Sequence, residues 1–146
     1  MNVVIMVGAS GSGKTTWIKE NLPEATVVST DLYWESTQKS FNPNELSKAH
    51  AWAIRDFIMQ CAMQAPTIVV DNTNTTAVEI APYIAIGKAY DAEIQVIWLG
   101  TDRIEELVRR NVHNVQEHTI RRHLDNMAST KMSWPFHWPM PKEVLE

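Results

Sequence analysis

The sequence has few of the features that mark secreted or membrane proteins. It contains one cysteine, Cys61, which excludes an internal disulfide and a cysteine-based zinc site and fits a reducing compartment. No apolar run approaches the roughly 20 residues that span a bilayer. The first residues lack the basic flank and long apolar core of a signal peptide. We therefore expect a cytoplasmic protein without a membrane partner.

Basic charge is also scarce. The chain has 13 Lys and Arg against 17 Asp and Glu, so its formal net charge at pH 7 is −4. A protein that coats duplex DNA needs a broad basic surface, so this composition argues against that class of function. A local cationic groove stays possible. The length of 146 residues predicts a single domain over residues 1–146, with a Trp- and Pro-rich tail at 130–146.

Short apolar runs alternate with segments of helical periodicity. Residues 30–43 show no clear period and predict a loop with at most a helical turn, and residues 134–141 predict an extended tail that packs over an apolar surface. Strands alternating with helices predict an α/β fold. We expect a three-layer sandwich: a mostly parallel sheet of four or five strands, helices on both faces and a C-terminal helical lid. The predicted strands are 2–7, 26–29, 67–70 and 93–99, and the predicted helices are 14–21, 45–64, 77–90, 103–111 and 117–129.

A phosphate-binding loop follows the first predicted strand. Residues 8–15 match the pattern G-x-x-x-x-G-K-[ST], and they lie between a buried strand and a helix, as the motif requires. Glycines allow the loop to wrap a phosphate chain with backbone N–H groups pointing inward, and the helix N-terminus adds about half a positive charge. Lys14 is expected to reach the β- and γ-phosphates, and Thr15 to hold Mg²⁺. The predicted cofactors are ATP and Mg²⁺, and the predicted loop residues are Gly8, Ala9, Ser10, Gly11, Ser12, Gly13, Lys14, Thr15 and Thr16.

A nucleoside triphosphate site leaves three broad classes, namely kinases, motor or switch ATPases, and GTPases. A remodelling ATPase usually needs a larger core and a sensor domain. A GTPase would carry a base-reading Asn-Lys-x-Asp signature, which this sequence lacks. The length and motif together favour a small P-loop kinase.

Asp31 follows the second predicted strand. Ligands of open α/β sheets bind at the carboxyl ends of the strands, so Asp31 is expected on the same edge as the phosphate loop. There it could accept the proton of an attacking hydroxyl, although a helix N-cap is the alternative. Tyr33 and Trp34 could stack an acceptor base or simply pack in the core.

A second polar group follows the third predicted strand. Asp71 occupies the position at which P-loop enzymes hold Mg²⁺. Asn72, Thr73 and Asn74 could hydrogen-bond an acceptor or orient Asp31, and Asn72 and Asn74 are the predicted substrate contacts. The alternative is a polar turn that caps the helix beginning near Ala77.

Arginines gather toward the C-terminal side. A transferring phosphoryl group spreads negative charge over its oxygens, and an arginine on a mobile element often stabilises it. We select Arg110 and Arg122 for this lid role, with a solvated helix face as the alternative. Histidines are spaced five residues apart among the arginines, which does not align them for a metal. The arginines are Arg103, Arg109, Arg110, Arg121 and Arg122, and the histidines are His113, His118 and His123.

These residues resemble the polynucleotide 5′-hydroxyl kinase family, in the branch of small P-loop kinase domains related to the T-even phage enzyme. The resemblance runs from Val3 to about Met127. Asp31 matches the family's general base toward the 5′-hydroxyl, and residues 71–74 resemble its D-[ND]-T-N segment. Residues 49–52 and the run at 110–113 are similar to members fused to other nucleic-acid domains. The resemblance implies ATP as donor, Mg²⁺ as cofactor and a nucleic-acid hydroxyl as acceptor.

The sequence departs from the phage pattern at two cationic positions. The phage enzyme has an arginine three residues after the base, where it grips the acceptor's 3′-phosphate, and here that residue is Trp34. A lid arginine is replaced by Asn114, and Arg121 or Arg122 could supply its charge. The sequence shows no second catalytic domain, so we expect no 3′-phosphatase activity.

The sequence thus predicts an ATP-dependent kinase that transfers the γ-phosphate to a hydroxyl, with the 5′-hydroxyl of a polynucleotide as the favoured acceptor. One alternative keeps the chemistry but has a nucleoside, a small metabolite or a hydroxymethylated base as acceptor. The other is a module that binds ATP without transferring phosphate. The partner is accordingly a nucleic-acid end or a small hydroxyl compound.

Overall fold

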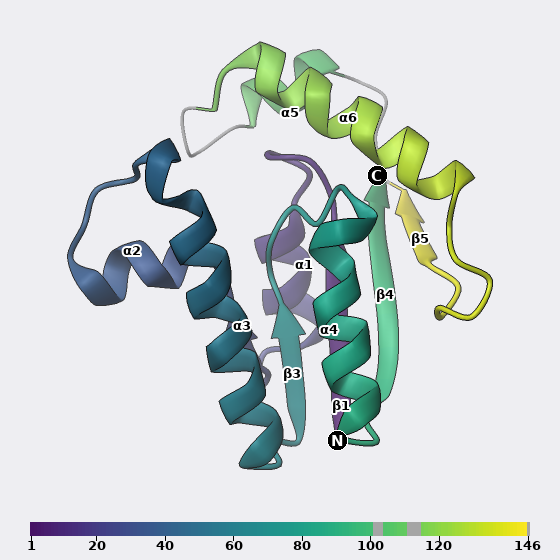
Figure 1. Ribbon diagram of the computed structural model, residues 1–146. Helices are drawn as coiled ribbons and strands as arrows, with labels where there is room; N and C mark the ends of the chain where they lie inside the picture. The colour runs from purple at the N-terminus through teal and green to yellow at the C-terminus, as the bar shows by residue number, and fades with distance from the viewer. Residues whose placement is uncertain (101–103, 111–114, 146) are drawn as a thin grey trace.

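The computed structural model describes residues 1–100, 104–110 and 115–145. Five strands form one sheet in the order β2-β3-β1-β4-β5, and each neighbouring pair is parallel (Figure 1). This arrangement confirms the predicted α/β fold and the upper of the two predicted strand numbers. The strands are β1 (Asn2–Val7), β2 (Thr26–Val28), β3 (Thr67–Val70), β4 (Glu93–Gly100) and β5 (Lys142–Leu145).

Helices cover both faces of the sheet. In Figure 1, α1 lies behind the sheet, α3 and α4 lie in front of it, and α5 and α6 lie above the carboxyl ends of the strands. The three layers and the C-terminal helical lid are therefore confirmed. The helices are α1 (Lys14–Asn21), α2 (Asp31–Thr37), the 3-10 helix η1 (Pro43–Glu45), α3 (Leu46–Ala62), α4 (Ala77–Ala89), α5 (Ile104–Arg109) and α6 (Glu117–Met132).

The central strands are buried on both faces, which explains their unbroken apolar sequences. Alternate residues of β1 point to opposite sides of the sheet. Val3 and Ile5 join the core beneath α3 and α4, whereas Val4 and Met6 pack with Ile18 of α1. Burying both sides anchors the phosphate loop, which begins directly after β1.

The prediction of a loop over residues 30–43 was wrong in part, because α2 begins at Asp31 and η1 at Pro43. The N-cap residue is Thr30, and the Ser29 hydroxyl before it accepts a hydrogen bond from the Asp31 N–H at 3.1 Å, which pairs the first backbone donor of the helix. Gln38 ends α2 in the left-handed region, at φ 56°. Seven residues are too few to display a helical period, so the pattern concealed this helix.

The predicted Trp- and Pro-rich tail contains more regular structure than expected. Residues 134–141 are neither helix nor strand, as predicted, but α6 continues to Met132 and β5 adds a fifth strand. The Trp134 ring packs edge-on against Trp98 of β4, with ring centroids 6.1 Å apart. Lys131 of α6 also forms an ion pair with Glu143 of β5. These contacts favour sealing of the core as the role of the tail.

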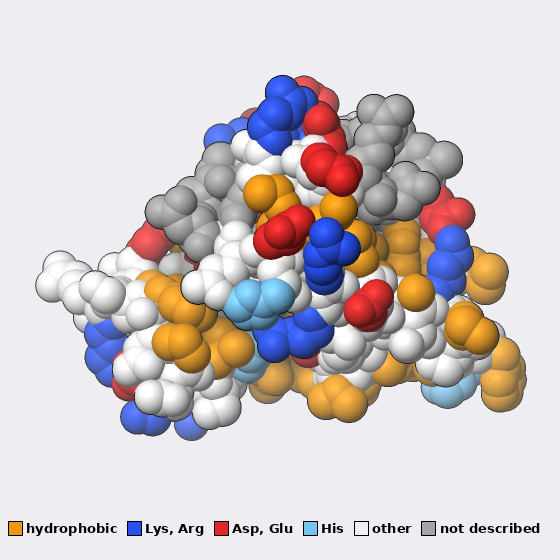
Figure 2. Space-filling model, turned by 90° about the horizontal axis from the view of Figure 1, so that it is seen from above, with side chains coloured by type: hydrophobic (Ala, Val, Ile, Leu, Met, Phe, Trp, Pro, Cys, Tyr) orange, Lys and Arg blue, Asp and Glu red, His pale blue; other side chains and the backbone are white. Residues whose placement is uncertain are grey.

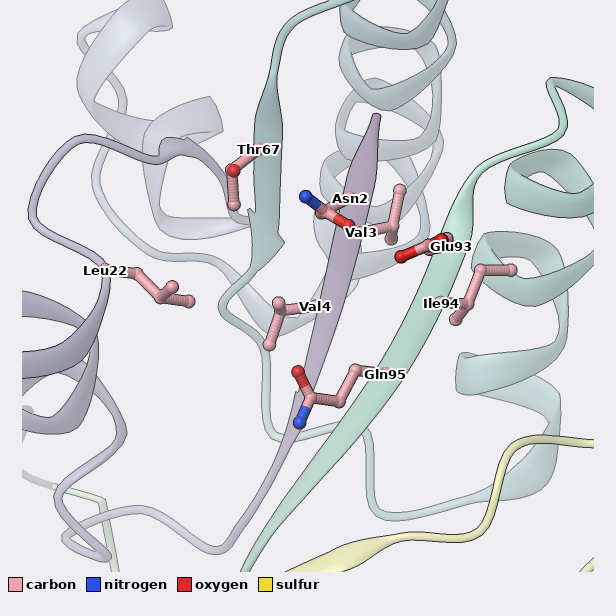
Figure 3. Close-up of a pocket in the computed structure, with 8 residues that line it drawn as sticks. All are labelled: Asn2, Val3, Val4, Leu22, Thr67, Glu93, Ile94 and Gln95. Atoms are coloured by element: carbon pink, nitrogen blue, oxygen red, sulfur yellow. The ribbon is translucent and has the colours of Figure 1, made fainter.

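A surface hollow of about 430 Å³ lies at the amino-terminal ends of the strands. Figure 3 shows its lining side chains coming from β1, β3 and β4 and from Leu22 after α1. The phosphate loop follows the opposite, carboxyl end of β1, so this hollow is separate from the site described below. Within the described ranges, no helix is both long enough and apolar enough to traverse a bilayer.

Candidate active site

The phosphate loop connects β1 to α1 and depends on glycine for its path. Gly11 and Gly13 have φ values of 84° and 92°, a region that side chains with a Cβ rarely adopt. The Gly8 N–H donates to the Thr73 carbonyl at 3.0 Å, which fastens the loop to the turn after β3. A β-carbon at Gly11 would collide with the Leu107 carbonyl oxygen, so α5 rests closely on the loop.

Lys14 is held inside the loop. Its ammonium donates to the carbonyls of Gly8 at 2.8 Å and Ala9 at 3.1 Å. Burial lowers the pKa of Lys14 from 10.5 to about 8, and the carboxylates of Asp71 and Asp31 oppose this fall. The side chain is therefore mostly cationic at neutral pH, within electrostatic range of both carboxylates.

Thr15 and Asp71 form the pair of oxygen ligands expected for Mg²⁺. The Thr15 hydroxyl donates to Asp71 Oδ2 at 3.1 Å, and the Asp71 N–H donates to the Val28 carbonyl at 2.8 Å. Mg²⁺ is usually held by one or two carboxylates together with substrate phosphates and water. In the part of the chain that the structure describes, no three His, Cys, Asp or Glu side chains gather as a separate metal site. The residues present thus fit magnesium bound jointly with a nucleotide.

Asp31 is exposed at the start of α2, and two polar neighbours hold its backbone in place. The Ser29 hydroxyl accepts from the Asp31 N–H, and Asn72 Oδ1 accepts from the Thr30 N–H at 2.9 Å. The Asp31 carboxylate lies near enough to the phosphate loop for its charge to raise the pKa of Lys14. In this position the carboxylate can accept a proton from a hydroxyl that approaches from solvent.

The structure gives Asn72 and Asn74 positions that the substrate-contact prediction did not anticipate. Both side chains are buried, with 6% and 0% exposure. Asn72 Nδ2 donates to the Tyr83 hydroxyl at 3.4 Å. Asn74, at φ 49°, donates to the Met6 carbonyl at 2.8 Å. This burial favours the role of orienting the site, since the two amides tie the turn after β3 to the Asp31 segment and to β1.

Tyr33 and Trp34 are also buried, at 6% and 8% exposure. They pack with Ala49 and Trp52 of α3, and their ring centroids lie 4.8 Å apart in an edge-on contact. A ring that stacks on a base must expose a face, so the observed burial favours the packing alternative.

The lid brings the two selected arginines into different surroundings. Arg122 is exposed on α6, and its charge acts on the neighbouring His123. Arg110 Nε lies 3.4 Å from Glu106. Arg121 forms an exposed ion pair with Glu117 at 3.2 Å. The lid role of Arg110 and Arg122 therefore stays a prediction. Arg103, His113 and Asn114, which also entered the sequence predictions, lie outside the described residues.

His123 is a site residue that sequence reasoning missed. Its Nδ1 accepts a hydrogen bond from the Ser10 N–H of the phosphate loop at 3.4 Å, across 113 positions of the chain. Burial lowers the pKa of His123 to about 4, with the charges of Lys14 and Arg122 adding to the effect. The imidazole is thus neutral and serves as an acceptor. Nothing in the local sequence distinguishes His123 from the exposed His118.

The face above the strands carries mixed charge. On its described part, Figure 2 shows Lys and Arg side chains interspersed with Asp, Glu and His. The cations on this face are thus balanced by acidic side chains, in agreement with the net charge of −4.

Comparison with known proteins identifies the family. Residues 3–131 match the model of a family described as an AAA domain. A human protein, NEDD4-binding protein 2, is 30% identical in an alignment of 133 positions, which covers 85% of this chain and 7% of that protein. The chain thus spans a small part of the curated relative that it matches.

Solved structures show the same fold. A chain in the structure of the Pnkp1/Rnl/Hen1 RNA repair complex has a TM-score of 0.76 at 19% identity, with 92% of this chain and 46% of that chain covered. Shikimate kinase from Acinetobacter baumannii, in complex with shikimate, has a TM-score of 0.62 at 15% identity, with 97% of this chain and 84% of that chain covered. The predicted P-loop kinase fold and the resemblance to polynucleotide kinases are confirmed. The chain belongs to the AAA domain family whose model it matches, and within it forms a P-loop kinase-like domain.

Proposed function

We propose that this protein is an ATP- and Mg²⁺-dependent kinase that phosphorylates a hydroxyl, namely the 5′-hydroxyl of a polynucleotide. The observation that carries this proposal is the meeting of three groups at one edge of the sheet. Lys14 lies in the phosphate loop, the Thr15 hydroxyl donates to Asp71 at 3.1 Å, and the charge of the Asp31 carboxylate acts on Lys14. We place the protein in the cytoplasm, where the buried Cys61 stays reduced.

In the proposed reaction, Asp31 accepts the proton of the attacking hydroxyl. A bond forms between the acceptor oxygen and the γ-phosphorus, while the bond from that phosphorus to the β–γ bridging oxygen breaks and ADP leaves. Lys14 and a lid arginine, Arg110 or Arg122, stabilise the negative charge on the transferring group, and the loop amides hold the phosphate chain. Bound magnesium neutralises phosphate charge and would be held by Thr15 and Asp71.

Two features favour a polynucleotide as acceptor. Asp31 and the segment 71–74 stand where the polynucleotide kinase family has its base and its D-[ND]-T-N segment. The similar solved chain with the TM-score of 0.76 comes from an RNA repair complex. A small hydroxyl compound is the second candidate. It is favoured by the burial of Trp34, which stands where the phage enzyme has its arginine for the 3′-phosphate.

The proposal is tested by offering labelled ATP to 5′-hydroxyl oligonucleotides, nucleosides and small alcohols. We expect label at the oligonucleotide 5′-end. Label found only on a small molecule would leave the kinase chemistry and exclude the polynucleotide. Tight nucleotide binding without transfer to any acceptor would instead favour the non-catalytic module.

Two variants assign the chemistry. Asp31→Ala should lower the turnover number by about 10²–10⁴-fold, the usual contribution of a general base, with ATP affinity unchanged. Lys14→Ala should weaken nucleotide binding and abolish transfer, because it removes the cation at the phosphates. Equilibrium binding and steady-state kinetics separate the two effects. Wild-type turnover in the Asp31 variant would remove this carboxylate from the mechanism.

A further inference from the structure

His123 makes a contact that the proposed function does not use. The Ser10 N–H is a backbone donor of the phosphate loop, and in this structure it donates to an imidazole of the lid helix α6. Backbone N–H groups of this loop are the donors that hold phosphate oxygens in P-loop proteins. His123 Nδ1 therefore stands where a phosphate oxygen is expected to accept.

Contacts on both sides of His123 hold the lid helices α5 and α6 in place over the phosphate loop. Ile120 and Met127 of α6 are buried in the main core, and the Thr130 hydroxyl donates to the Thr75 carbonyl at 2.7 Å. In α5, Leu107 is fully buried, and its carbonyl lies against Gly11. Because both lid helices are anchored, the imidazole stays close to the loop when its bond to Ser10 is broken.

The charges around His123 determine its protonation. The charge of Lys14 acts on it from the loop, and that of Arg122 from the adjoining position of α6. Asp31 and Asp71 act on Lys14 from α2 and from the end of β3. The neighbouring lid helix α5 carries Glu106, which lies 3.4 Å from the Nε of Arg110 just beyond that helix. Two cations next to a partly buried imidazole oppose its protonation, whereas an arriving phosphate would reverse the sign of its surroundings.

We propose that His123 binds the terminal phosphate of the nucleotide and takes up a proton as it does so. The phosphate oxygen replaces Nδ1 as acceptor of the Ser10 N–H, and the imidazolium that forms donates a charge-assisted hydrogen bond to the phosphate. The observed length of 3.4 Å is longer than the usual range for an N–H donor, as expected for a contact that is readily exchanged. This inference rests on the nucleotide site of the proposed function.

The test measures proton uptake when a non-hydrolysable ATP analogue binds with Mg²⁺. Calorimetric titrations at pH 6 in buffers of different ionisation enthalpy give the number of protons exchanged. An anion within 4–6 Å raises a pKa by about 1–3 units, so from a starting value of about 4 we expect His123 to take up about half a proton. His123→Asn should abolish this share of the uptake and weaken analogue binding by about tenfold, since a hydrogen bond to a charged group is lost.

His118→Asn is the matched control, because His118 is exposed on the same helix and its substitution should leave both quantities unchanged. The analogue's own ionisation is the same in all variants and cancels in their difference. The ¹⁵N shifts of the wild-type imidazole report protonation independently of any substitution, so a poorly folded variant does not affect this result. They should change from the neutral to the imidazolium pattern when the analogue binds.

The possible failures are distinguishable. Binding of the analogue with no uptake assigned to His123 overturns this inference and leaves the kinase proposal intact. Tighter binding in His123→Asn without a change in uptake also overturns it, because His123 would then only compete with the phosphate. If the wild-type protein does not bind the analogue at all, the nucleotide site of the proposed function fails as well.

Discussion

The hydrogen bond from Thr30 to Asn72 offers a direct test of how Asp31 is positioned. Thr30 immediately precedes Asp31, and its N–H donates to Asn72 Oδ1 at 2.9 Å. Asn72→Ala removes this acceptor. Leaving a partly buried backbone donor unpaired should lower the free energy of unfolding by about 1–3 kcal/mol. A catalytic group displaced by about 1 Å can lose 10²-fold in rate, so we expect the turnover number to fall by about 10–100-fold.

Tyr83→Phe is the matched control for this variant. The Tyr83 hydroxyl accepts from Asn72 Nδ2 at 3.4 Å, and the ring packs edge-on against Phe57. Burial raises the pKa of Tyr83 to about 12, so the hydroxyl stays protonated at working pH. Removing the hydroxyl breaks the long hydrogen bond from Asn72 Nδ2 and leaves the bond between Asn72 Oδ1 and the Thr30 N–H intact. We expect a loss of less than about 1 kcal/mol and near-normal turnover.

Urea unfolding gives the stability of each variant, and initial rates at saturating ATP and acceptor give the turnover number. The reasoning requires that Asn72→Ala lower turnover while the affinity for ATP stays near wild type, since the phosphate loop is not altered. Equal losses of turnover in the two variants would refute it. Such a result would mean that the core contact of Asn72, and not its bond to Thr30, holds Asp31 in place.

Two further predictions concern stability. Gly11→Ala should destabilise the fold by about 1–3 kcal/mol, because the added carbon collides with the Leu107 carbonyl oxygen and φ is 84°. Gly100→Ala is its control, since the nearest atom to the added carbon is 3.6 Å away, and equal melting temperatures for the two would contradict the argument. The pKa of His123 is about 4 in the folded protein, against 6.5 for an unperturbed histidine, so the unfolded chain binds more protons between these values. Stability should therefore fall as pH drops from 6.5 to 4. His123→Asn should reduce the dependence of the free energy of unfolding on pH across this range. An unchanged pH dependence would show that His123 does not cause the loss of stability.

The positions of the main elements were predictable because their signals are local. Strand β1 is an apolar run bounded by a glycine-rich loop, and its bounds were predicted without error. Helix α3 showed its period over many residues and was misplaced only by a residue or two at its ends. Helix α2 escaped detection because seven residues do not complete enough turns to show a period. Strand β5 escaped because its four residues, of which two are charged, are too few to show a strand pattern, and it lies at the edge of the sheet beside β4.

The nucleotide site shows the same division between local and non-local signals. The order of residues 8–15 predicts the loop, since its glycines and Lys14 are contiguous, and Asp31 and Asp71 were selected because each follows a strand. The roles of Asn72 and Asn74 depend on how far their side chains are buried, which the sequence does not show. Asn72 and Asn74 have the composition of a ligand-binding turn, and only their burial shows that their amides are engaged with Tyr83 and Met6.

The sequence alone determined the phosphate loop, the alternation of strands and helices, and the carboxylates at the strand ends, because backbone preference and hydrophobic period act over a few residues. Only the tertiary structure decided that Asn72 supports the Asp31 segment and that His123 meets Ser10. Those contacts join residues 42 and 113 positions apart, and the packing of the lid and the sheet brings them together. The residues adjacent to Asn72 and His123 in the chain do not indicate these contacts, because the same residue types also occur where the side chain is exposed to solvent.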